Sequence, residues 1–276
     1  MGKPSAISAA SVRARLQYLA RSDDGSAVYF ASQAGGNTAE HDGQYVWHDV
    51  TINDARLYPL SLDKQGFALA SHETAITDFH DDQLLATTYN AELEALLTAH
   101  TGARRVYVFD HTRRAASDSV RRQQTMREPS AVIHNDYTAW SAEKRLAEIL
   151  PDEAATLMSG RFAIVNVWRS IAGTVETMPL AFCDSTTLGP DDIIAVTREA
   201  KDRIGQIQMA RYNPAHEWVY FPHMEMDEVA LIKTYDSATD GRTRFTIHTA
   251  FTDPTSPPGA APRRVKHGCC IWRRNV

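Results

Sequence analysis

The chain has 276 residues and carries 29 Lys and Arg against 34 Asp and Glu, a formal net charge of −5. Its composition, 43% hydrophobic and 23% charged, is typical of a globular protein and excludes a collagen, a coiled coil and a disordered chain. No apolar run approaches the about 20 residues that a membrane-spanning helix needs, so no membrane segment is expected.

Short segments rich in β-forming residues dominate the chain. The first 22 residues are interpreted as an N-terminal lead-in. Strands are predicted at residues 27–32, 44–52, 67–71, 105–110, 161–169, 217–221, 229–235 and 244–251, and residues 190–208 predict a further strand and turn.

Two helices are predicted between these strands. Residues 81–100 carry a stripe of leucines, and Gly102 follows as a stop. Residues 141–150 predict a second helix that Ser141 caps and Pro151 ends. Many short strands with few helices favour a mainly β fold with flanking helices over alternating βαβ units, and we expect a barrel or jelly roll.

The cysteines and arginines of the sequence indicate which cellular compartment and which kinds of binding partner to expect. Cys183, Cys269 and Cys270 are too few for a disulfide framework and lack the CxxC spacing of a zinc site, which favours a reducing, cytoplasmic location. Arginines gather between residues 104 and 127. The negative net charge of the chain and the lack of a nucleic-acid-binding motif nevertheless disfavour nucleic acid as a partner. We expect a solvated surface there, with one or two arginines turned inward to hold a carboxylate.

The most informative segment is Ala131-Val-Ile-His134-Asn-Asp136-Tyr137. Side chains alternate between the two faces of a strand, so His134 and Asp136 are expected on one side, where they can present an imidazole and a carboxylate to one metal ion. Such a pair also occurs by chance, as a surface pair or a hydrogen bond.

A third ligand would complete the 2-His-1-carboxylate site of non-haem Fe(II) enzymes. His248 lies in a strand-like segment beside Thr246 and Ala250, which are small and leave room for an ion. His223, directly after Pro222, is the rival, but it lies in a turn, and a ligand needs a rigid element. We rank His248 first.

Two arginines are candidates for holding a dicarboxylate near such a site. Arg263 follows His248 beyond a Pro-rich loop, and Arg169 closes the segment Asn166-Val-Trp-Arg169. The planar guanidinium suits a carboxylate because it donates two parallel hydrogen bonds. An exposed position in a basic tail is an equal alternative for Arg263.

Several of these segments together resemble the hydroxylase/desaturase family of secondary metabolism, which includes gibberellin-desaturase-like, AsaB-type and CmcJ/NvfI-type proteins. The resemblance runs in order from about Leu16 to Arg264 and rests on these motifs: SLDKQGF, DHTRR, HNDYT, NVWR, TMPLAFCDS, DEVALIKTYDS, and HTAFTDP followed by PRR. It implies a double-stranded β-helix (cupin-like), Fe(II), 2-oxoglutarate and O2. The family's motifs fall on His134, Asp136 and His248 as metal ligands and on Arg263 as the 2-oxoglutarate arginine. Val265 and the segment from Lys266 to Cys270 depart from the family's pattern.

The sequence therefore predicts an Fe(II)/2-oxoglutarate-dependent dioxygenase that hydroxylates, desaturates or cyclises a small-molecule substrate. We expect one oxygenase domain over residues 1–276, with the catalytic barrel core in about 105–276 and the N-terminal part packed on it. Two alternatives stay open: an iron oxidase that does not use 2-oxoglutarate, and a non-catalytic jelly roll that binds a small molecule.

Overall fold

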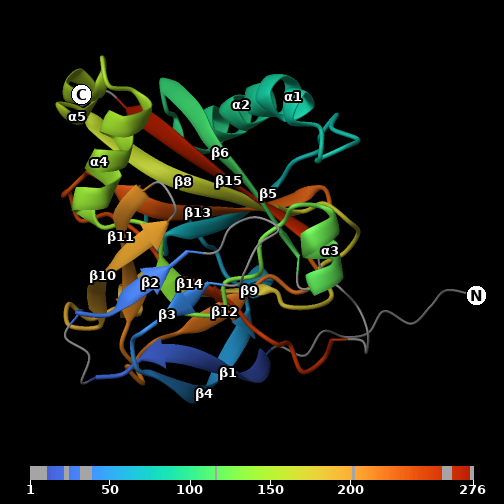
Figure 1. Cartoon of the computed structure of the whole chain (residues 1–276), viewed down its shortest axis with the longest axis vertical. Coiled ribbons are helices and arrows are strands. Elements are labelled where there is room, and N and C mark those ends of the chain that lie inside the picture. The colour runs from blue at the N-terminus through green and yellow to red at the C-terminus, as the bar shows by residue number, and fades with distance from the viewer. Residues whose placement is uncertain are drawn as a thin grey trace, which may run out of the picture.

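Two β-sheets packed face to face form the body of the computed structural model (Figure 1). The structure describes residues 11–21, 25–31, 39–115, 117–200, 203–256 and 263–273, with the backbone alone for Asp118 and for 263–273. Among these residues, the larger sheet has ten strands, in the spatial order β1 (Ser11–Leu19), β4 (Tyr45–Asp54), β12 (Trp218–Tyr220), β9 (Leu180–Cys183), β14 (His248–Ala250), β7 (His134–Asn135), β11 (Arg203–Ala210), β10 (Ile193–Ala200), β2 (Val28–Phe30) and β3 (Glu40–His41).

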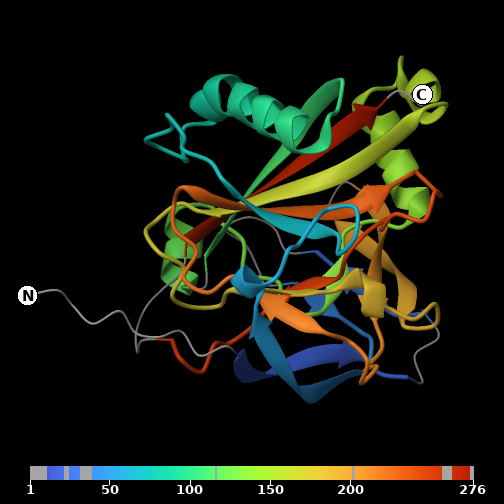
Figure 2. The ribbon, with the colours of Figure 1, turned by 180° about the vertical axis from the view of Figure 1, so that it is seen from behind.

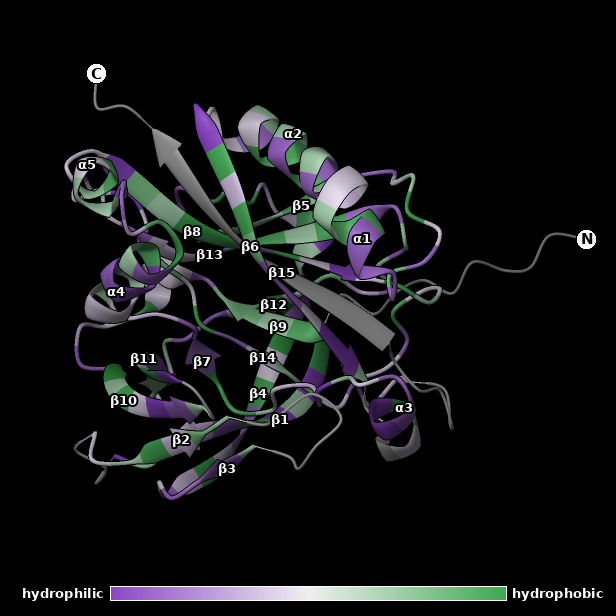
Figure 3. Cartoon of the chain, turned by 45° about the horizontal axis from the view of Figure 1, so that its top comes forward, coloured by the Kyte–Doolittle hydropathy of each residue, from purple (hydrophilic) through white to green (hydrophobic). Residues whose placement is uncertain are grey.

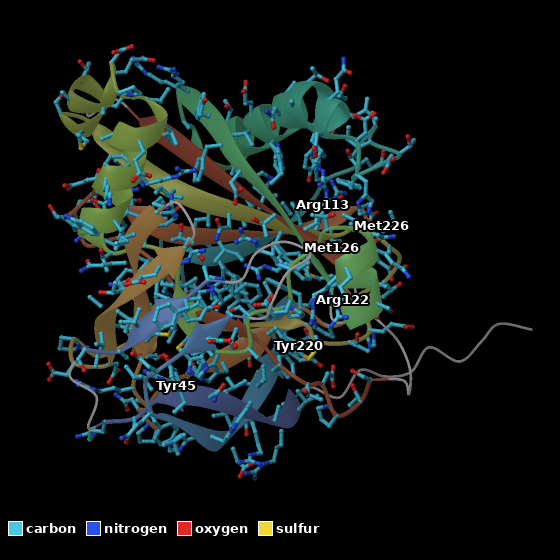
Figure 4. All side chains as sticks on the ribbon, in the orientation of Figure 1. Tyr45, Arg113, Arg122, Met126, Tyr220 and Met226 are labelled. Atoms are coloured by element: carbon cyan, nitrogen blue, oxygen red, sulfur yellow. The ribbon has the colours of Figure 1, made fainter. Side chains whose placement is uncertain are left out.

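The smaller sheet covers one face of the larger one. Its described strands are, in spatial order, β5 (Phe67–Ser71), β13 (Glu228–Asp236), β8 (Arg161–Ser170), β15 (Arg263–Arg273) and β6 (Arg105–Ala115). Figure 2 shows the same two layers from behind, and Figure 4 shows side chains filling the space between them, with Tyr220 labelled in the larger sheet. Two mainly antiparallel sheets in this arrangement form a jelly roll with flanking helices, so the predicted fold class is confirmed.

Helices lie on the outer side of the smaller sheet and at its end. They are α1 (Asp82–Leu84), the π-helical stretch η2 (Leu85–Tyr89), α2 (Asn90–Thr101), α3 (Asp118–Gln123), α4 (Ala139–Ile149) and α5 (Ala154–Met158), with short 3-10 turns at Ala55–Leu57 and Ser185–Thr187. The predicted helix at 81–100 is confirmed, and Gly102 ends it in the left-handed conformation at φ 64°. No helix of the described residues is long and apolar enough to cross a membrane.

Strand β8 is buried on both faces, which explains its nearly continuous apolar sequence. Val165 and Val167 pack outward against Leu93 and Leu97 of α2. Trp168 points the other way, into the core between the sheets. In Figure 3, apolar residues likewise alternate with polar ones along β6, beside α2.

Two sequence predictions need correction. The strand predicted at 244–251 is shorter, because Thr246 bridges the sheets instead: its N–H donates to Lys233 O and its hydroxyl to Cys183 O, so β14 begins at His248. The N-terminal lead-in is wrong for residues 11–19, which form β1. The alternating burial of Val12, Ala14 and Leu16 against the larger sheet stabilises that strand.

Helix α4 begins two residues before the predicted Ser141. Thr138 is its N-cap: its hydroxyl accepts from Ser141 N (3.1 Å), while Ser141 Oγ accepts from Thr138 N (2.9 Å). This reciprocal capping box fixes the N-terminus of α4, whose N-cap residue lies two residues after Asp136.

Thr138→Ala is expected to lower the free energy of unfolding by about 1 kcal/mol, because an N-cap hydroxyl satisfies a helix N–H that is otherwise left without a partner. Urea unfolding followed by circular dichroism measures the change. Thr138→Ser keeps the hydroxyl and should retain most of the stability. Equal losses in both variants would contradict the capping role.

Candidate metal centre

Two short strands of the larger sheet bring the predicted histidines together. His248 of β14 lies directly opposite His134 of β7 in the antiparallel register. Their ring centroids are 4.6 Å apart, and both residues are buried, with exposed fractions of 8% for His134 and 3% for His248. A one-residue change of register would move one histidine to the opposite face, so this pairing decides whether a site forms.

Asp136 completes a cluster of three metal-ligating groups. One ligand atom from each of His134, Asp136 and His248 lies within 4.8 Å of the other two. Asp136 Oδ1 is 3.7 Å from His134 Nε2. Two imidazole nitrogens and one carboxylate oxygen at this spacing suit a divalent transition metal such as Fe(II).

Hydrogen bonds fix the orientation of these ligands. His134 Nδ1 lies 2.8 Å from Val132 O, a contact in which Nδ1 donates, and this leaves the lone pair of Nε2 directed to the cluster. Asn166 of β8 donates from Nδ2 to Asp136 Oδ2 at 2.5 Å. The donor set therefore fits a bound ion, with one carboxylate oxygen held by the protein and the other near His134.

Asn135 anchors the loop that carries both ligands. Its side chain is buried and donates from Nδ2 to Tyr137 O, Gln208 Oε1 and Thr234 O, at 2.7–3.0 Å. These bonds attach the segment between His134 and Asp136 to strands of both sheets. No role was predicted for Asn135 or Asn166 from the sequence. The available signal was an amide side chain inside an otherwise apolar strand, as in Val165-Asn166-Val167.

Two cavities meet at the three residues. One is largely apolar and is lined by His134 and His248 together with Trp168, Leu180, Ile232 and Ala250. The other contains Asp136, Tyr137 and Asn166 and has many basic side chains. Arg114 lines both. A ligand in either cavity would therefore lie next to the metal-ligating atoms.

The structure does not bring Arg169 to this place. Arg169 alternates with Trp168 along β8 and therefore lies on the outer face of the smaller sheet. Its guanidinium is buried over the rings of Phe79 and Tyr89 and donates to His72 O (3.1 Å) and to Met226 O. It thus attaches the helical layer to the sheet, and the carboxylate-binding role expected of it has no support in its contacts.

The other predicted arginine and the rival histidine are placed as follows. Arg263 is the first residue of β15 and its backbone pairs with Ala115, next to Arg114; its side chain lies outside the described residues. His223 lies in an exposed turn with φ 49° and is not part of the cluster. The preference for His248 over His223 therefore agrees with the geometry.

Asn166→Ala is expected to weaken Fe(II) binding by about 10- to 100-fold, the usual effect of removing a hydrogen-bond partner of a metal ligand. Anaerobic titration of metal-free protein with Fe(II) measures this affinity. Asn166→Asp keeps an acceptor but removes the donor, and should also weaken binding through repulsion of Asp136. Unchanged affinity in both variants would contradict the orienting role of Asn166.

A jelly roll that carries two histidines and one carboxylate at a single point defines the class of 2-His-1-carboxylate metal proteins. A family model described as "Oxidoreductase/YMDC permease-like domain" matches residues 16–265. The hydroxylase/desaturase efuI of Hormonema carpetanum is 29% identical over 97% of both chains. The Fe(II)/2-oxoglutarate-dependent dioxygenase nvfI of Aspergillus novofumigatus is 30% identical over 78% of this chain and 80% of its own.

A solved structure agrees with the fold. That of the iron and alpha-ketoglutarate-dependent endoperoxidase NvfI superposes with a TM-score of 0.83 and 22% identity, over 96% of this chain and 99% of that one. The chain belongs to the hydroxylase/desaturase family, so the resemblance predicted from its motifs is confirmed.

Proposed function

We propose that this protein is an Fe(II)- and 2-oxoglutarate-dependent dioxygenase that hydroxylates, desaturates or oxidatively cyclises a small molecule of secondary metabolism. The observation that carries the proposal is the cluster of His134, Asp136 and His248, whose ligand atoms lie within 4.8 Å of one another where two cavities meet. The names of its relatives, which are hydroxylases, desaturases and Fe(II)/2-oxoglutarate-dependent dioxygenases, support the same activity.

The three ligands are assigned distinct contributions. His134 Nε2 and an imidazole nitrogen of His248 would hold the ion on the strand side, and Asp136 Oδ1 would complete the protein's share and offset part of its charge. Bound iron, with 2-oxoglutarate and O2, supplies the oxidising chemistry. The chain's own task is to orient the ligands, exclude water with apolar walls such as Trp168 and Ile232, and place the substrate's C–H bond.

We assign the binding of 2-oxoglutarate to Arg263 rather than to Arg169. The position of Arg263 after the HTAFTDP segment, which resembles the family's motif, supports this assignment, whereas Arg169 is engaged on the far face of the sheet.

We further propose a single domain over residues 1–276 and a cytoplasmic location. Strands β1 to β5, which precede residue 105, belong to both sheets and support the first proposal. The thiol of Cys183 is buried and not in a disulfide, which fits a reducing compartment.

Anaerobic absorption spectroscopy tests the proposed activity. Fe(II) followed by 2-oxoglutarate, added to metal-free protein, should give a weak visible charge-transfer band that requires both additions. Iron binding without the band would indicate an oxidase that does not use 2-oxoglutarate. Absence of iron binding would contradict the proposal and favour a non-catalytic jelly roll that binds a small molecule.

A further inference from the structure

The cavity on the Asp136 side of the metal centre has more basic than acidic side chains. Its basic residues are Arg114, Arg127, Lys144, Arg198 and Arg203. Three acidic residues also line it: Asp110, which accepts a hydrogen bond from Thr112 (2.9 Å), Asp136 of the candidate metal centre, and Glu148, which pairs with Arg203 (3.5 Å) and Lys144 (4.0 Å). The excess of positive charge is therefore concentrated on the remaining arginines.

Arg127 and Arg198 have side chains with no hydrogen-bond or ion-pair partner in the part of the chain that the structure describes. They approach the cavity from opposite sheets. Arg198 projects from β10 of the larger sheet, whereas the backbone of Arg127 is bonded to β6 of the smaller one, through Arg127 N to Arg113 O (2.9 Å) and Ala115 N to Arg127 O (2.8 Å). Two guanidinium groups that line one cavity, one from a strand and one from a segment hydrogen-bonded to a strand, form a site for an anion.

The surroundings of Arg198 make its positive charge unfavourable for the stability of the protein when no ligand is bound. Burial lowers the pKa of Arg198, and the positive charges of Arg203 and Arg127 lower it further, while Asp136 acts in the opposite direction. By contrast, the more exposed Arg56 forms two hydrogen bonds with Glu228. A partly buried cation among like charges is destabilising unless something neutralises it, and such groups gather at binding sites.

We propose that Arg127 and Arg198 bind a carboxylate of the substrate, and that the substrate is a small organic acid with an apolar body. Phe109, Tyr137 and Ile204 line the same cavity and supply apolar surface beside the two guanidiniums. Because Asp136 also lines this cavity, an acid held in this way extends toward the metal centre. The inference rests on the proposed oxygenase function and names the substrate class of that site.

Thermal unfolding with matched probes tests the inference on protein loaded anaerobically with Fe(II) and 2-oxoglutarate. Benzoate should raise the melting temperature with increasing concentration, and the isosteric, neutral benzamide should raise it far less. Arg198→Gln and Arg127→Gln should each weaken benzoate binding about tenfold or more, because each removes a charge-assisted hydrogen bond to the carboxylate. Arg198→Gln should also raise the melting temperature without ligand.

Arg13→Gln serves as the matched control, since Arg13 is an exposed strand residue of β1 away from the cavity. It should respond to benzoate as the wild type does. Equal stabilisation by benzoate and benzamide, or benzoate binding that survives both substitutions, would overturn the inference. Stronger stabilisation by phenyl phosphate than by benzoate would assign the site to phosphate esters and overturn it as well.

The 2-oxoglutarate band separates this inference from the proposed function. The band should persist in both variants at the wild-type 2-oxoglutarate concentration. Its loss would show that Arg127 and Arg198 bind the cosubstrate, which overturns the inference and leaves the oxygenase function intact. Absence of the band in the wild type would contradict the oxygenase function, while the benzoate response of metal-free protein would still test the two arginines.

Discussion

His248→Ala and Asp136→Ala are each expected to abolish Fe(II) binding at micromolar protein and, with it, the release of succinate from 2-oxoglutarate. Each change removes one of three ligand atoms that lie within 4.8 Å of one another. The loss should exceed the about 10- to 100-fold that follows from removal of an outer hydrogen-bond partner. Anaerobic Fe(II) titration and a succinate assay measure the two effects.

His223→Ala is the control for the histidine change. His223 is exposed in a turn after Pro222 and lies outside the cluster, so its replacement should leave Fe(II) affinity and succinate release unchanged. Asp110→Asn is the control for the carboxylate change. Asp110 lines the same cavity as Asp136 but is not in the cluster, so this variant should also keep its Fe(II) affinity. Full iron binding by His248→Ala, or its loss in His223→Ala, would contradict the assigned ligands.

The pairing of His134 and Asp136 as candidate metal ligands could be predicted because their pattern is local. His134 and Asp136 are two residues apart, a spacing that strand geometry converts directly into a shared face. His248 is 114 residues from His134 in sequence, and its position opposite His134 depends on the register between β14 and β7. Residue patterns ranked His248 first but kept His223 as an alternative, and the resemblance of the HTAF motif to the family strengthened the preference for His248.

The arginines show where sequence reasoning fails. Arg169 and Trp168 are neighbours, so the strand sends them to opposite faces, but residue types alone do not reveal which face meets the metal centre. The basic segment at 104–127 was expected to turn one or two arginines inward, and Arg114 and Arg127 do line the cavity. Arg198 gave no signal, because Arg114, Arg127 and Asp136, which line the same cavity, are distant from it in sequence.

The shortness of β14 and the presence of β1 were missed for a related reason. Residues 244–247 have strand-like composition, but Thr246 uses its backbone N–H and its hydroxyl to connect β13 with β9. Residues 11–19 have a period-two pattern in which alanine and tyrosine share the buried face with valine and leucine, so the pattern is weak until β4 pairs with it. Long-range pairing decides both cases.

A buried ion-pair network joins β13 and β8 of the smaller sheet, and its disruption is expected to have the largest effect on the free energy of unfolding. Asp236 of β13 is fully buried and accepts hydrogen bonds from Arg161 at 2.9 and 2.5 Å and from Lys233 at 3.0 Å. Lys233 is only 2% exposed and also donates to Asp63 Oδ1 at 2.9 Å. Two cations therefore depend on one buried carboxylate.

Asp236→Ala is expected to lower the free energy of unfolding by about 3–5 kcal/mol, because removing one partner leaves buried charge without compensation. Urea unfolding at neutral pH measures this loss. Asp240→Ala removes an exposed carboxylate whose salt bridge with Arg242 lies at the surface, and it should change stability little. Similar effects of the two substitutions would contradict the importance of burial.

The pH dependence of stability provides a separate test of the same network. Burial raises the pKa of Asp236, but the hydrogen bonds from Arg161 and the charge of Lys233 outweigh burial and hold this pKa below its ordinary value. A lowered folded-state pKa stabilises the protein above the unfolded-state pKa of about 3.9, and this contribution is lost as the pH falls through the folded-state value. The free energy of unfolding should therefore fall less steeply below about pH 4 in Asp236→Ala than in the wild type. Parallel pH profiles would show that other carboxylates cause the acid sensitivity, and that Asp236 stabilises the sheet through packing alone.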